Sequence, residues 1–296
     1  MEQVHNQRHA ISIIETTIRP LFHAVHNRRQ NMKHSDDLRR VRDEDPYFSG
    51  TLAKGLLILQ TFVSDPRAHA NSEFAAKLGL SRPTVSRLCR SLLTMGFLDH
   101  DDRLDRYFIG PAAVALCYPY IINTPMLGML RPAMQQLADR IEGAVSVGVT
   151  TDLDVVYLET CAHESGTLKR PGVGAVRGIV ETAMGRAWLA QLPAQECQAF
   201  LARVKRERPD EFARCSDGVR ESLAHYARRG FSINLGDTGF GVLAAGVAAR
   251  IRYGPRRLLF NCAVPGLHWK KSQLLDTIGP GLMQLVGAAD RQSGMR

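Results

Sequence analysis

The segment from Asn71 to Arg90 constrains the fold of this chain most, because its pattern predicts two short helices joined by a tight turn. Ser72 is placed to cap the first helix. Apolar residues at helical spacing give that helix one buried face: Phe74, Ala75 and Leu78. Gly79 then ends the helix, since glycine adopts the left-handed conformation of a sharp helix exit at little steric cost.

The second helix of this segment has two different faces. Ser81 is placed to cap it, and Pro83 fits its first turn, where a missing N–H costs nothing. Apolar residues recur with the spacing of a buried stripe: Val85, Leu88, Cys89 and Leu92. The opposite face carries basic and hydroxyl side chains, with no acidic residue from 81 to 94: Arg82, Thr84, Ser86, Arg87 and Arg90.

Two interpretations of this pattern are open. A positive, hydroxyl-rich second helix is what the major groove of DNA accepts from a helix-turn-helix. On that interpretation Ser81 and the five residues of the basic face contact DNA. The alternative is an ordinary helical hairpin whose basic face is only solvated.

The residues that follow predict a β-hairpin wing. Gly96 ends the second helix, and short apolar segments at 97–98 and 107–109 enclose a polar loop. Arg103 and Arg106 are candidates for contact with phosphate or the minor groove, although the four aspartates of the loop oppose such contacts. A preceding helix over about 51–63 is expected to add apolar residues to the core: Leu52, Leu56, Leu59 and Phe62. Residues 49–110 are thus predicted to form a winged helix-turn-helix.

Length and charge bound the remaining possibilities. A chain of 296 residues is long enough for two domains, and its formal net charge of +9 favours non-specific affinity for polyanions. No run of eighteen apolar residues occurs, and the N-terminus lacks the pattern of a secretory signal. We therefore expect a cytoplasmic protein without a membrane span.

The cysteines do not predict a metal site or a disulfide framework. All six are scattered without a C-x-x-C pair, which favours small buried residues in a reducing compartment. Cys161 and His163 have no second pair of ligands near them in the sequence. We expect neither a metal nor a cofactor.

Two segments outside the winged helix carry weaker expectations. Residues 1–48 are expected to form a flexible N-terminal extension, and translation starting at Met32 would omit residues 1–31. Residues 111–122 predict an apolar helix that Asn123-Thr124-Pro125 breaks, so 111–125 is interpreted as a linker and dimerisation helix. The alternative is a helix buried within its own chain. DNA-binding proteins of this kind usually work as dimers.

From about Leu127 the pattern becomes mixed. Helices are predicted at 130–141, 182–190, 194–206, 218–229 and 272–289, and strands at 144–149, 155–160, 241–249 and 258–264. Strands, then helices, then strands again indicate an α+β domain with an antiparallel sheet.

At this point the chain resembles the IclR family of bacterial transcription regulators over roughly 49–290. The resemblance rests on the order and spacing of six motifs: Thr51–Leu59, Leu80–Leu88, Arg106–Gly110, Glu181–Ala190, Arg229–Phe231 and Asn261–Pro265. It implies an N-terminal winged helix, a linker helix and a GAF-like effector-binding domain over 126–296. It also implies homodimers that can pair into tetramers, and control of nearby catabolic operons.

The resemblance further implies where an effector binds. The family's central loop falls on Gly174, Ala175 and Val176. Its acidic position falls on Asn234, with Asp237 close by, and its strand positions fall on Ala244, Asn261 and Ala263. Two of those strand positions are alanines where relatives that bind small keto acids carry hydroxyl or thiol groups, and a common proline is Gly178 here. A roomier, less polar pocket follows, which favours an aromatic or branched organic acid.

Two arginines and an enzymatic alternative complete the site hypotheses. Arg177 or Arg186 could pair a ligand carboxylate, although each suits a surface or helix-terminal charge better. Cys262 and His268 could form a nucleophile pair, but Cys262 lies in an apolar run, and the glycines at 172, 174 and 178 have the wrong spacing for a nucleotide loop.

We therefore predict a sequence-specific transcription regulator, not an enzyme, that binds double-stranded DNA near its own gene and is switched by a small organic acid. The alternative is a metabolite-binding protein or enzyme in which the basic helical hairpin is only a surface or partner-binding element. The sequence leaves the operator, the effector and the sign of regulation open.

Overall fold

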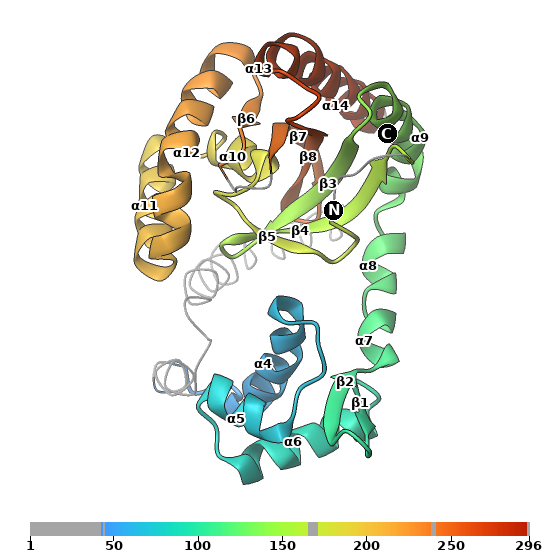
Figure 1. Ribbon diagram of the computed structural model, residues 1–296, viewed down its shortest axis with the longest axis vertical. Coiled ribbons are helices and arrows are strands. Elements are labelled where there is room, and N and C mark those ends of the chain that lie inside the picture. Colours follow the sequence, from blue (N-terminus) through green and yellow to red (C-terminus); the bar gives the residue numbers. More distant parts are fainter. Residues whose placement is uncertain (1–42, 44, 165–170, 238–240, 295–296) are drawn as a thin grey trace, which may run out of the picture. The chain divides into compact units, whose positions relative to one another are not determined.

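The computed structural model describes residues 43, 45–164, 171–237 and 241–294 (Figure 1). The chain divides into two compact units, residues 1–117 and 118–296. The predicted N-terminal extension, with its alternative start at Met32, lies almost entirely outside the described residues.

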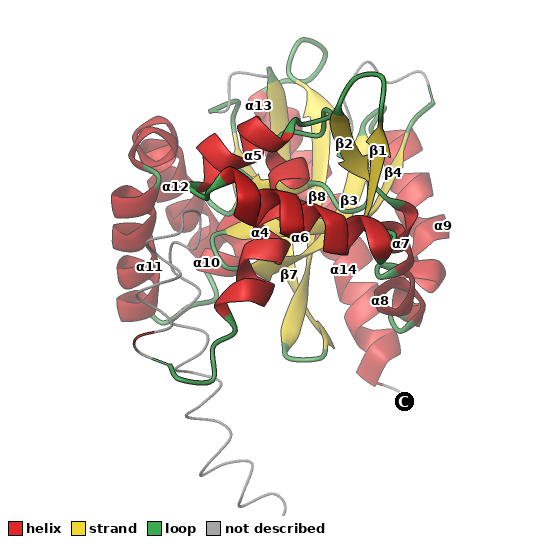
Figure 2. Cartoon of the chain, turned by 90° about the horizontal axis from the view of Figure 1, so that it is seen from below, coloured by secondary structure: helices red, strands yellow, loops and turns green. Residues whose placement is uncertain are grey.

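The first unit is a winged helix-turn-helix, as the sequence predicted. Its elements are α4 (Gly50–Ser64), α5 (Asn71–Leu78), α6 (Arg82–Thr94), β1 (Leu98–Asp101), β2 (Arg106–Ile109) and α7 (Pro111–Ala115) (Figure 2). Strands β1 and β2 pair antiparallel, and the backbone of His69 pairs with Tyr107 on β2. The wing is therefore attached to the segment that leads into α5.

The core of this unit lies between its three main helices and the wing. It contains Leu57, Ile58, Phe62, Phe74, Leu78, Val85, Cys89 and Leu98. The predicted contribution of the first helix was partly wrong, because Leu52 and Leu56 are exposed while Leu57 and Ile58 are buried. The predicted cap of α5 was also wrong. That helix begins after Ala70, whose backbone N–H donates to Glu73 Oε2 at 2.7 Å.

The predicted helix over 111–122 is two short helices. Helix α7 ends at Ala115 and α8 spans Tyr118–Ile122, so the interruption coincides with the division between the two units. Pro119 explains the break, because it has no N–H to donate to Ala115 and its ring clashes with that carbonyl in a continuous helix.

The second unit is built on an antiparallel sheet in the order β5-β4-β3-β8-β7-β6. Its strands are β3 (Ala144–Thr151), β4 (Asp154–Ala162), β5 (Val176–Gly178), β6 (Ser232–Asn234), β7 (Val242–Tyr253) and β8 (Arg256–Pro265). The predicted α+β architecture is confirmed. The three-residue strands β5 and β6, which form the two edges, were not predicted.

Helices cover both faces of this sheet (Figure 1). One face packs against α9 (Pro125–Arg140) and α14 (Gly279–Gly294), and the other against α10 (Ala183–Leu189), α11 (Ala194–Glu207) and α12 (Pro209–Arg229). The predicted closing helix is interrupted: a short α13 (Lys271–Gln273) leads into a π-helical turn at Leu274–Ile278. Pro280 follows that turn and cannot supply the N–H that a regular helix needs.

No single helix of the described part of the chain is both long and apolar enough to cross a membrane. The bent pair Pro111–Ile122 and Pro125–Arg140 meets that test together, by length and composition alone.

Candidate DNA interface and effector site

The core fixes the orientation of α6, and with it the direction of the predicted DNA-binding face. Val85 and Cys89 are fully buried, so the opposite side of the helix faces solvent. Ser81 caps the helix: its Oγ accepts from the Thr84 N–H at 3.4 Å and lies 2.8 Å from Thr84 Oγ1. Thr84 is half-buried, and the other members of this face are exposed: Ser81, Arg82, Ser86, Arg87 and Arg90.

No described residue neutralises the charges of the arginines on α6. In the part of the chain that the structure describes, the guanidinium groups of Arg82, Arg87 and Arg90 make no hydrogen bond or ion pair. Their charges are therefore available to an outside partner.

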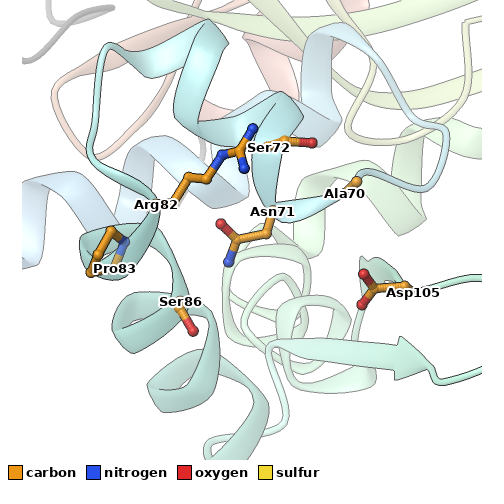
Figure 3. A pocket seen from close by; sticks show the side chains of 7 residues that line it. All are labelled: Ala70, Asn71, Ser72, Arg82, Pro83, Ser86 and Asp105. Carbon is orange, nitrogen blue, oxygen red and sulfur yellow. The ribbon is translucent and has the colours of Figure 1, made fainter.

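A shallow hollow lies beside the start of α6 (Figure 3). It is open to solvent, has a volume of about 470 Å³, and is lined by Ala70, Asn71, Ser72, Arg82, Pro83, Ser86 and Asp105. The Arg82 side chain extends toward Ser72 on α5, while Asp105 of the wing lies on the far rim. The hollow thus combines hydroxyl and amide groups with one charge of each sign.

The two predicted arginines of the wing differ. Arg103 is exposed and has no ion pair among the described residues. Arg106 is half-buried: its Nη1 donates to Glu73 Oε2 at 2.7 Å and to the Ala68 carbonyl at 3.2 Å. Its contacts therefore hold the wing against α5, a role that the sequence did not indicate.

Glu73 links these parts of the domain. It accepts hydrogen bonds from the Ala70 N–H and from Arg67 and Arg106, and these bonds and charges lower the pKa of its carboxyl to about 2. The acidic loop of the wing also contains a histidine, which lies beside two of its aspartates. The His100 ring nitrogens lie 2.9 Å from Asp102 Oδ1 and 3.2 Å from Asp105 Oδ1.

In the second unit, the predicted strand positions share the face of the sheet that α10 covers. Ala244 pairs with Ala263, which lies two residues beyond Asn261 on β8, so alternation puts all three on one side. Gly246 identifies that side, because a Cβ there would lie 2.3 Å from the backbone carbon of Ala183 on α10.

The predicted loop lies at the edge of the same sheet. Gly174 has a φ of 84° and donates its N–H to the Tyr157 carbonyl at 2.8 Å. The Ala175 carbonyl accepts from the Tyr157 N–H at 2.9 Å, and Val176 begins β5. These backbone bonds fasten the loop to β4.

Asn234 and Asp237 are engaged inside the protein. Asn234 donates Nδ2 to the Glu181 carbonyl at 2.7 Å, and its Oδ1 accepts from the N–H groups of Gly236 and Asp237. The Asp237 carboxylate accepts from Arg186, which is 1% exposed and also donates to the carbonyls of Val180 and Ile233. Arg186 is therefore unavailable to a ligand carboxylate, contrary to one of our hypotheses.

Three polar residues near Asn261 were not predicted as site residues from the sequence. Ser146 and Thr160 lie beside Asn261 in the sheet register, and Ser232 lies beyond Gly246 on β6. Their signal was the alternation of small polar and large apolar residues along strands such as β3.

Chemistry at a cysteine is disfavoured in this unit. Burial raises the pKa of the Cys262 thiol far above its ordinary value, which opposes formation of a thiolate nucleophile. Among the described residues, no group of three or more His, Cys, Asp or Glu side chains is arranged to hold a metal ion.

Two family models match this chain. The IclR helix-turn-helix domain matches residues 51–102, and the C-terminal domain of the bacterial transcriptional regulator IclR matches residues 119–259, together more than half of the chain. The chain belongs to the IclR family. The resemblance seen in the sequence motifs is thereby confirmed, and the chain is a DNA-binding transcription regulator rather than an enzyme.

Relatives of known role are also regulators. The chain is 26% identical to the HTH-type transcriptional regulator TsaQ1/TsaQ2 of Comamonas testosteroni, over 83% of this chain and 88% of that protein. It is 25% identical to the Pca regulon regulatory protein of Pseudomonas putida, over 54% of this chain and 55% of that protein.

Solved structures share the fold. An IclR family transcriptional regulator from Brucella abortus is 28% identical, with a TM-score of 0.76 over 85% of this chain and 95% of its own. An IclR homologue from Microbacterium hydrocarbonoxydans is 18% identical, with a TM-score of 0.61 over 80% of this chain and 99% of its own, which shows the fold alone.

Proposed function

We propose that this IclR-family member recognises an operator near its own gene through α6, and that a small organic acid, aromatic in character, switches this binding from the second unit. The proposal assigns DNA binding to residues 49–110, linkage to 111–125 and effector binding to 126–296. The observation that carries it is the set of unpaired guanidinium groups on the outer face of α6.

The side chains of α6 have distinct roles in this proposal. Arg82, Arg87 and Arg90 donate to guanine edges in the major groove or to phosphates. Thr84 and Ser86 add hydroxyl contacts, and Ser81 presents the N-terminus of the helix to a phosphate. Arg103 contacts the backbone from the wing, while Arg106 keeps the wing in position through Glu73.

We base the effector class on the small side chains of the sheet. Ala244 and Ala263 contribute only methyl groups to the face that α10 covers, and Asn261 adds a polar group. The homologue from Microbacterium hydrocarbonoxydans was solved in complex with 4-hydroxybenzoate, which supports an aromatic acid. An effector changes DNA affinity only by binding the two states of the regulator differently, typically with about 1–3 kcal/mol of coupling.

Self-association is part of the proposal. Large apolar side chains are exposed on both units: Leu52, Leu56, Val114 and Leu116 on the first, and Tyr118 and Ile122 on the second. We take these exposed apolar side chains as candidates for an interaction surface on each unit. A homodimer, able to pair into a tetramer, would cover these residues and present two copies of α6.

The first experiment compares operator binding by the wild type, Arg87→Ala and Arg220→Ala. Fluorescence anisotropy would be recorded with DNA from upstream of the gene and with unrelated DNA across a salt series. Arg220 lies on α12 in the other unit, is exposed, and pairs with the exposed Asp217, so its replacement removes one charge without touching the winged helix-turn-helix. We expect Arg87→Ala to lose about 1–3 kcal/mol of operator affinity if it contacts a base, or about one unit of salt slope if it contacts a phosphate.

Arg220→Ala should leave the operator affinity and its salt slope unchanged. Equal affinity of the wild type for both DNAs, or an Arg87→Ala variant that matches Arg220→Ala, would contradict the assigned role of α6. Titration of the wild-type complex with aromatic acids then tests the sensor, which fails if none of them changes operator affinity or thermal stability.

A further inference from the structure

One buried amide in the effector-binding unit lacks a partner within the protein. Asn261 lies in the middle of β8 and is 6% exposed. Among the fully buried side-chain nitrogen and oxygen atoms of the described residues, only Asn261 Oδ1 has no hydrogen-bond partner. Burying an unpaired amide oxygen is unfavourable, so native proteins rarely retain one without a use.

The neighbours of Asn261 form two rows of small or polar residues across five strands. The row that contains Asn261 comprises Thr160, Ser146, Asn261, Gly246 and Ser232. The next row comprises Ala162, Ala144, Ala263, Ala244 and Asn234. Both rows lie on the α10 face, which elsewhere carries large apolar residues such as Tyr157 and Leu259. This end of the face therefore lacks the side-chain volume that fills the other end.

The hydroxyl groups beside Asn261 are engaged away from its amide oxygen. Thr160 Oγ1 donates toward the Pro171 carbonyl at 2.9 Å and toward Ser146 Oγ at 3.0 Å. Ser146 lies beside Asn261 in the pairing of β3 with β8, yet no described group donates to Asn261 Oδ1. This oxygen is therefore an acceptor that a ligand could satisfy.

We infer that the effector carries a hydroxyl group that donates to Asn261, so that the ligand class is the hydroxylated aromatic acids rather than the plain ones. An ionised carboxylate is acceptor-only and cannot satisfy Oδ1, whereas a phenolic hydroxyl can. This inference rests on the proposed function, because it specifies the ligand of the effector-binding unit.

The test measures the binding of matched probes to the full-length protein by isothermal titration calorimetry. The probes are the three hydroxybenzoate isomers, their methoxy counterparts, which accept but cannot donate, and benzoate. At least one hydroxybenzoate should bind about 10- to 100-fold more tightly than its methoxy counterpart and than benzoate, since a buried polar group left unpaired is costly.

Asn261→Leu should reduce this ratio to about one while keeping the fold. Leucine is close to asparagine in size and removes an unpaired polar group, so the ligand-free variant should melt no lower than the wild type. Asn234→Leu is the matched contrast. It removes an amide with three hydrogen bonds and should lower the melting temperature clearly. Asn261→Ser, which restores a hydroxyl acceptor, should recover part of the preference.

Three other results would overturn the inference that the ligand hydroxyl donates to Asn261. If hydroxybenzoates, methoxybenzoates and benzoate bind equally, or the hydroxyl preference survives in Asn261→Leu, the inference is overturned while the effector role stands. Tighter binding of benzoate would mean that the amide offers Nδ2 instead, which also overturns it. If no benzoate binds, the aromatic effector of the proposed function fails, and this inference fails with it.

Discussion

Glu73 receives hydrogen bonds from three directions in the winged-helix unit. The Ala70 N–H, Arg67 and Arg106 all donate to its carboxylate, so one side chain starts α5 and ties the wing to it. Sequence patterns place Glu73 in the first turn of a helix but do not reveal that Arg106, 33 residues away, reaches it. Arg103 and Arg106 were equivalent candidates in the sequence, and only the fold separates them.

The lowered pKa of Glu73 makes a pH-dependent contribution to stability. Because its pKa falls from 4.5 to about 2 on folding, the contribution is complete above pH 4.5 and is lost as the pH falls toward 2. We expect Glu73→Gln to melt below the wild type at pH 7, with the difference shrinking between pH 4.5 and 2. Thermal melts of the full chain followed by circular dichroism measure this.

Glu221→Gln is the control for this prediction. Glu221 lies on α12 and pairs with Lys271 at an exposed site, where such pairs contribute little. A gap between wild type and Glu73→Gln that stays constant down to pH 2, or one equal to that of Glu221→Gln, would refute the role given to Glu73.

At the scale of the element, α6 depends on Ser81 for its start. Ser81→Ala should cost about 1 kcal/mol of stability through loss of the cap. Ser81→Asp keeps a capping oxygen and places a negative charge at the positive end of the helix, so stability should be retained. That charge would repel a phosphate, and operator affinity should fall.

The pair of variants separates capping from DNA contact. Urea unfolding measures the loss of stability when the cap is removed, and fluorescence anisotropy with operator DNA measures the loss of DNA affinity. A Ser81→Asp protein with wild-type operator affinity would show that no phosphate lies near the start of α6.

Two glycines in helices should respond oppositely to the same substitution. Gly218 on α12 allows the Asp237 carboxylate to reach Arg186, because a Cβ at 218 would lie 1.8 Å from Asp237 Oδ2. We expect Gly218→Ala to destabilise the protein by on the order of 3 kcal/mol, since displacing one partner leaves the other charge buried.

Gly128 on α9 is the matched site, because a Cβ added there would meet no atom within 4 Å. Gly128→Ala should therefore stabilise by about 0.5–1 kcal/mol through helix propensity alone. Chemical denaturation of both variants provides the comparison. Stabilisation by Gly218→Ala would mean that the ion pair with Arg186 contributes nothing.

Periodicity predicted the long elements because their stripes of apolar residues face a core. Helix α6 and strands β3, β4, β7 and β8 carry that signal. Strands β5 and β6 have three residues each, too few for an alternation to be read. The breaks at Pro119 and before Pro280 were hidden because the apolar pattern continues through them while the backbone hydrogen bonding does not.

At the scale of the whole molecule, the candidate effector site was predictable only through the family resemblance. Its strand positions lie far apart in the sequence and meet through sheet register, which one chain's pattern does not specify. The pairing of Arg186 with Asp237 is of the same kind, because the two residues approach only when β6 joins the sheet.

A homodimeric regulator should require a fixed phase between two half-sites. Inserting roughly half a helical turn, about 5 base pairs, between the half-sites should weaken binding more than inserting a full turn of about 10. Footprinting and anisotropy on such operators measure this, with sedimentation giving the oligomeric state. Equal loss with both insertions would contradict two-fold recognition.

Helix α10 meets the sheet through backbone atoms, because a Cβ at Gly246 on β7 would collide with Ala183. It meets the segment that follows β5 in the same way, since a Cβ at Gly185 would lie 2.2 Å from the Ile179 carbonyl oxygen. Side chains can change rotamer to admit a differently shaped guest, but touching main chains cannot. An effector site with these fixed backbone contacts would accept few ligand shapes and would discriminate strongly between them. Its ligand specificity would change through substitution of single alanines rather than through movement of the helix.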